Sequence, residues 1–114
     1  MKSWTLSPEL QARPDLAAAV EKLRPVLDGQ VIPAKYASPV SADWRLGADD
    51  DGRDAVVLHL ADPSWPDGVE DRFDPRKFDD KLDTRMGLRL LYIQLLGAGN
   101  EARIERLVQA AEAD

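Results

Sequence analysis

A run of aspartates followed by a glycine, in the segment WRLGADDDGRDAVVLHL, is the part of the chain most suggestive of chemistry. An EF-hand calcium loop needs oxygen ligands at positions 1, 3, 5 and 12 with glycine at position 6. With Gly52 at position 6, Asp49 and Asp51 fall at positions 3 and 5, but position 1 is Gly47 and position 12 is Leu58. The spacing therefore favours a hairpin turn at Asp51 and Gly52, with at most adventitious cation binding, over a calcium site.

His59 is the only histidine and lies within the apolar segment AVVLHLA. An imidazole can act as a general base, but it needs an orienting carboxylate and a nucleophile nearby, and the sequence identifies neither. The pattern favours a core or edge histidine whose ring bonds a backbone carbonyl. Cysteine, a P-loop and a Rossmann fingerprint are absent from the sequence, and we expect no cofactor, no metal and no catalytic residue.

Four basic residues follow one another at steps of four, namely Lys77, Lys81, Arg85 and Arg89. On a single helix they form one row at the edge of the apolar face, and like charges at this spacing repel each other. One interpretation is that the long stems lie along the rim of the core while the charged heads meet the acidic middle of the chain. The other is that the row binds an anionic partner, and a helix break near Gly87 would remove the row altogether.

Negative charge is concentrated in the middle of the chain. Of a net charge of −6, residues 41–71 carry two bases and nine acids, whereas the flanking segments are close to neutral. This acidity disfavours nucleic-acid binding. Trp65 lies here between two prolines, where its ring could meet a partner or fold back on the core. The predicted partner-binding residues are Asp49, Asp50, Asp51, Trp65, Asp67, Glu70, Asp71, Lys77, Lys81, Arg85 and Arg89.

Two strands are predicted on either side of the aspartate turn. Polar and apolar residues alternate over about 40–47, and the apolar run over about 54–61 is typical of a more central strand. We expect an extended connector at 31–39 (VIPAKYASP) and a surface loop at 62–75, because both are rich in proline or glycine. A two-stranded sheet is marginal, so a third strand is expected from VIPAKY or from LLYIQLL at 90–96.

Three helices are predicted from apolar residues that recur every three or four positions. The first spans about 15–28 and must kink or end near Pro25. The longest spans about 75–96, although its second half, 88–96, is apolar all round and could be a core strand. The last spans about 100–112. The core-facing residues of the longest helix are predicted to be Phe78, Leu82, Met86, Leu90 and Ile93.

These elements predict an α+β fold, a small antiparallel sheet packed against three helices, in a single domain of residues 1–114. The sequence shows no signal peptide and no bilayer-spanning run, which predicts a soluble, cytoplasmic protein without a membrane partner. The first expected function is a non-catalytic accessory or regulatory subunit that binds another protein through its acidic hairpin and loop. The alternatives are an antitoxin-like inhibitor that imitates nucleic-acid charge, and an enzyme of unknown chemistry centred on His59.

Overall fold

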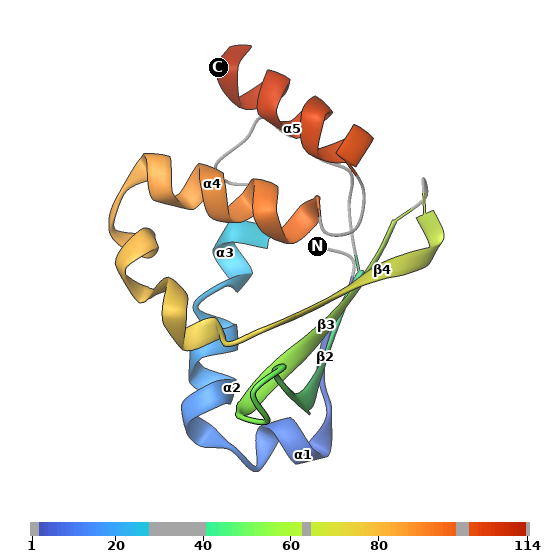
Figure 1. Cartoon of the computed structure of the whole chain (residues 1–114), viewed down its shortest axis with the longest axis vertical. Helices are drawn as coiled ribbons and strands as arrows, with labels where there is room; N and C mark the ends of the chain where they lie inside the picture. The colour runs from blue at the N-terminus through green and yellow to red at the C-terminus, as the bar shows by residue number, and fades with distance from the viewer. Residues whose placement is uncertain (1–2, 28–40, 63–64, 98–100, 114) are drawn as a thin grey trace.

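The computed structural model describes residues 3–27, 41–62, 65–97 and 101–113. In chain order (Figure 1), the elements are β1 (Ser3–Leu6), α1 (Pro8–Gln11), α2 (Pro14–Glu21), α3 (Arg24–Leu27), β2 (Ser41–Ala48), β3 (Asp54–Asp62), β4 (Trp65–Phe73), the 3₁₀ helix η1 (Pro75–Asp83), α4 (Arg85–Leu96) and α5 (Glu101–Ala113). The fold is α+β, as predicted. The connector expected at 31–39 lies outside the described residues.

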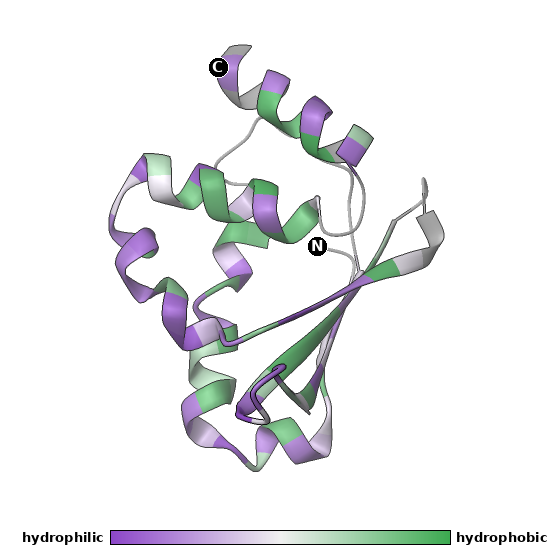
Figure 2. Cartoon of the chain, viewed as in Figure 1, coloured by the Kyte–Doolittle hydropathy of each residue, from purple (hydrophilic) through white to green (hydrophobic). Residues whose placement is uncertain are grey.

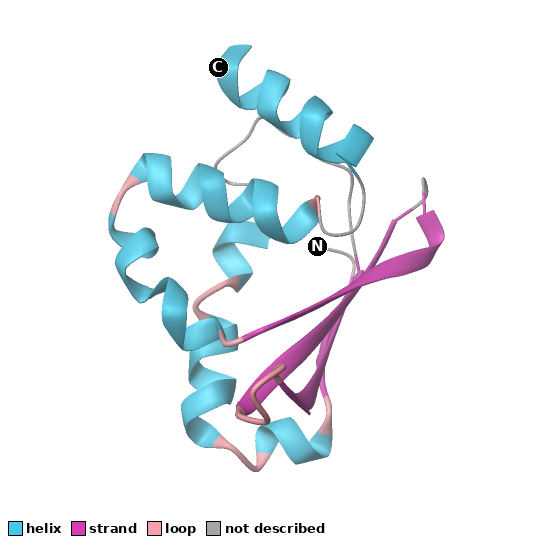
Figure 3. Ribbon diagram, in the orientation of Figure 1, coloured by secondary structure: helices cyan, strands magenta, loops and turns pink. Residues whose placement is uncertain are grey.

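The four strands form one mixed sheet in the order β1-β2-β3-β4. Figure 3 shows the strands gathered together beside the helices. β2 and β3 are the predicted hairpin, and their pairing runs from Ser41 opposite Ala61 to Ala48 opposite Asp54. β1 is parallel to β2, and β4 is antiparallel to β3. Both outer strands therefore come from segments in which the sequence predicted no strand.

The surface loop predicted over 62–75 is wrong, because residues 65–73 form β4. This strand pairs with β3 and lies at the edge of the sheet, where a proline is tolerated because one side of the strand needs no ladder partner. Of the two segments expected to supply a third strand, 90–96 is helical and 31–36 lies outside the described residues.

The continuous helix predicted over 75–96 is also wrong. η1 ends at Asp83, and Thr84 has an extended backbone with φ −130° and ψ 151°. The Thr84 hydroxyl accepts the N–H of Gly87 at 2.9 Å and so caps a new helix, α4. Threonine offers this bond only when its own backbone is non-helical, which explains the break. Segment 88–96, left open between helix and strand, is helical.

The other two predicted helices are present. In place of one helix over about 15–28, α2 ends at Glu21 and α3 begins at Arg24, so the interruption expected near Pro25 is confirmed. Residue 28 lies outside the described part. The helix predicted over 100–112 is α5, whose described bounds are Glu101–Ala113. Within the described ranges, no helix is both long and apolar enough to cross a membrane.

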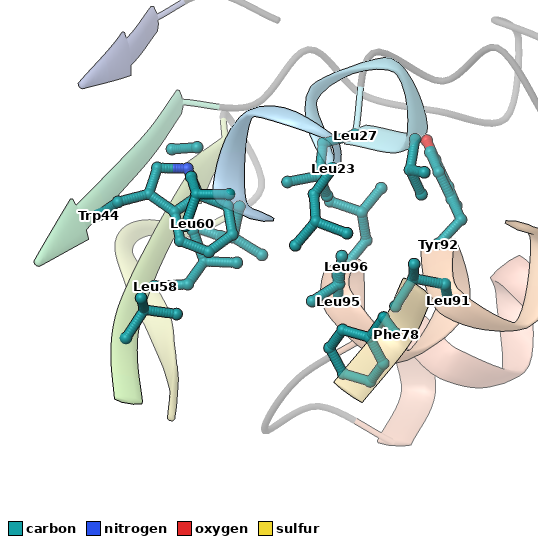
Figure 4. Packing of buried hydrophobic residues seen from close by; sticks show 14 of the residues in the cluster. Leu23, Leu27, Trp44, Leu58, Leu60, Phe78, Leu91, Tyr92, Leu95 and Leu96 are labelled. Atoms are coloured by element: carbon teal, nitrogen blue, oxygen red, sulfur yellow. The ribbon is translucent and has the colours of Figure 1, made fainter. Parts of the chain in front are cut away.

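The hydrophobic core lies between the sheet and the helices. Figure 4 shows Trp44, Leu58 and Leu60 on the sheet side, with side chains of η1 and α4 opposite them. The buried residues of the helices and of the turn between α2 and α3 include Leu10, Leu16, Val20, Leu23, Val26, Leu27, Phe78, Leu91, Tyr92, Leu95 and Leu96. Burying each of the larger side chains contributes about 1.5–3 kcal/mol relative to exposing it, so this layer stabilises the packing of the helices on the sheet.

The sheet has one helix-facing side and one open side. In Figure 1, α2, α3, η1 and α4 all lie to one side of it, and in Figure 2 the hydrophobic colour is concentrated along β3 and α4. Because side chains alternate along a strand, the register fixes which residues share a side. It places Asp71 opposite Leu58 on the helix-facing side, and Glu70 opposite His59 on the open side.

Candidate functional site

A row of polar side chains crosses the open side of the sheet, with one residue from each strand. Thr5, Asp43, His59 and Glu70 are successive partners in the strand register. The Thr5 hydroxyl donates to Asp43 Oδ1 at 2.8 Å. Glu70 Oε1 accepts a hydrogen bond from Arg45 Nη2 at 2.7 Å and lies 3.6 Å from His59 Nδ1. The sequence did not predict this row, because it depends on two strands that the sequence does not reveal.

His59 therefore has a carboxylate neighbour, Glu70, where the sequence predicted a backbone carbonyl. The other edge of the ring packs on Gly68 of β4. A Cβ added to Gly68 would lie 2.4 Å from His59 Nε2 and 2.9 Å from Cε1. A general base oriented through Nδ1 must exchange its proton at Nε2. Because that nitrogen lies against backbone, the arrangement suits strand packing better than acid–base chemistry.

The described acids and His59 do not gather into a metal site. Among the residues that the structure describes, no three histidine, aspartate or glutamate side chains are grouped closely enough to hold an ion. The acids of the polar row instead meet the hydroxyl and guanidinium groups of neighbouring strands.

The acidic segment at the hairpin tip is a turn, as predicted. Gly52 has φ +78°, and the Asp49 carboxylate accepts the N–H groups of Asp51 and Arg53, each at 2.9 Å. Asp51 does not share the positive φ of Gly52. The loop is thus a type I turn closed by a left-handed glycine rather than a tight two-residue turn. Asp50 and Asp51 are exposed at its tip.

An ionic network joins the turn end of the hairpin to the helices. Arg13 pairs with Asp54 at the start of β3 and with Asp15 in α2, and Arg76 of η1 pairs with Asp15 at 3.0 Å. Arg76 also pairs with Asp74 at 2.9 Å, and its side-chain hydrogen bond lowers the pKa of Asp74. The hairpin acid Asp54 thus pairs with Arg13, which lies between α1 and α2, and not with the predicted basic row.

The prediction that four basic residues form a single row is wrong. Lys77 and Lys81 lie in η1, whereas Arg85 and Arg89 lie beyond the break in α4. In a 3₁₀ helix with three residues per turn, side chains four residues apart diverge by roughly 120°. Lys81 places Nζ 5.4 Å from the ring centroid of Phe78. The four cations therefore do not form the continuous surface that the sequence suggested.

The outer face of α4 exposes apolar side chains. Met86 and Leu90 are 65% and 54% exposed, and they are the large hydrophobic residues that the described part of the chain leaves exposed. Both were predicted to face the core. The break before α4 changes the phase of the helix, so that its buried residues are Leu91, Tyr92, Leu95 and Leu96. Ile93 is half-buried.

The α4 outer face, as we use the term, consists of Met86, Leu90 and Ile93 flanked by Arg85 and Arg89. At 100° per residue, the three apolar residues fall within about 60° of one another. Arg89 and Arg85 follow about 60° and 100° to one side of Met86. Arg85 is exposed and Arg89 is half-buried. Sequence periodicity alone could not find this face, because a segment that is apolar all round does not reveal which side is buried.

Asp71 belongs to the predicted set and lies on the helix-facing side of the sheet. It lies opposite Leu58, and its carboxylate accepts the N–H of Arg72 at 2.9 Å. Burial raises the pKa of Asp71, and the Arg72 hydrogen bond offsets only part of this effect. A raised folded-state pKa means that the charged form is less favourable in the folded protein than in the unfolded one.

We therefore expect Asp71→Asn to stabilise the protein at neutral pH. Ionised Asp71 destabilises the fold above its folded-state pKa, and this penalty disappears as the pH falls below the unfolded value of about 3.9. The gain in the urea midpoint should thus be present at pH 7 and absent near pH 3. Glu70→Gln on the open side is the matched control, and it should not stabilise. An unchanged or lower midpoint for Asp71→Asn at pH 7 would contradict the assignment.

The predicted partner-binding residues do not form one surface. Glu70 and Asp71 lie on opposite sides of the sheet, and the acids of the turn lie at the end of the hairpin. Trp65 and Asp67 belong to β4 by their backbone, but their side chains lie outside the described part of the structure. Comparison of the chain with protein-family models, with curated proteins and with solved structures found no match.

Proposed function

We propose that this chain is a non-catalytic protein-binding module that docks its partner on the α4 outer face. The observation that carries the proposal is the exposure of Met86 and Leu90, at 65% and 54%, one helical turn apart. Single exposed hydrophobic side chains are common on protein surfaces, but adjacent ones that form a stripe mark interaction sites. A partner that covered them would gain up to about 1.5–3 kcal/mol per side chain from burial.

The polar row on the open side of the sheet gives less support to a catalytic role. Its acids are engaged with Thr5 and Arg45, and His59 packs its Nε2 edge on Gly68. Asp49 accepts hydrogen bonds within the turn, and Asp54 pairs with Arg13. Docking through the acidic hairpin would have to rely on the exposed Asp50 and Asp51 at the tip.

Affinity capture from source-cell lysate, quantified by mass spectrometry, tests the proposal with two matched double variants. Met86→Ser with Leu90→Ser removes the apolar stripe, and Asp50→Ser with Asp51→Ser removes the charges of the turn. Both pairs are exposed, so both variants should keep the circular dichroism spectrum and melting temperature of the parent. We expect a protein enriched by the parent to be lost with the first variant and kept with the second. The reverse pattern would assign docking to the hairpin, and retention by both would contradict docking at either place.

A further inference from the structure

We draw no further inference here: the strongest candidate, the exposed apolar stripe of Met86 and Leu90 on the α4 outer face, belongs to the docking site already proposed, and nothing in the described part of the structure shows what covers it.

Discussion

Replacing Gly68 by alanine should destabilise the protein by about 2–5 kcal/mol, through backbone strain and overpacking together. Gly68 has φ +73°, which L-residues rarely adopt. The added Cβ would also lie 2.4 Å from His59 Nε2 and 2.5 Å from the backbone oxygen of Leu60. The imidazole could move aside, but the oxygen belongs to β3 and cannot move unless β4 separates from it.

Gly52→Ala is the control, because Gly52 has a similar φ of +78° but nothing within 4 Å of its added Cβ. Its free energy of unfolding should fall only by the cost of backbone strain, about 1–2 kcal/mol. Urea unfolding of the two variants isolates the steric part as the difference between them. Adding His59→Ala to Gly68→Ala should recover some stability but not all. Equal losses for the two glycine variants would show that β4 does not need this close approach to β3.

Trp44→Ala is expected to cost about 3–5 kcal/mol, a large share of the 5–15 kcal/mol typical of a small domain. Trp44 is fully buried in β2, and its ring centroid lies 5.3 Å from that of Trp4 and 5.9 Å from that of Phe73. Alanine would leave a cavity between both outer strands and the helices, so the variant should melt well below the parent protein.

Trp44→Phe is the matched comparison and should be much less damaging. It keeps an aromatic ring and removes the indole N–H, which has no acceptor among the described residues. Far-UV circular dichroism during urea unfolding is the suitable measurement, since replacing a tryptophan changes the fluorescence itself. A loss below about 1 kcal/mol for Trp44→Ala would mean that the aromatic cluster is not central to the core.

The parts of the fold that the sequence predicted are those that local interactions determine. The hairpin followed from alternation on both sides of a turn, and Gly52 took the positive φ that the Asp-Gly pair suggested. β4 was missed because its proline, glycine and acids disfavour a strand in isolation. Pairing with β3, which is not visible in a local pattern, provides the partner that makes it one.

The candidate site was predicted less well, because its position depends on the phase of a helix. If 75–96 were one helix, Met86 and Leu90 would share the face of Phe78. The break at Thr84, made by one hydroxyl–amide hydrogen bond, turns both residues outward. The polar row with His59 likewise needs residues from all four strands, two of which the sequence did not reveal.

The β4 edge of the sheet is poorly suited to pairing with a strand of another molecule. Pro66 supplies no backbone donor, the pairing register shifts between Leu60 and Asp62, Gly68 has a positive φ, and Asp71 lies on the helix-facing side of the sheet. These are the features by which proteins prevent strand-by-strand growth into aggregates. At the opposite edge, the described part of β1 is four residues long. Concentrated solutions should therefore resist fibril formation.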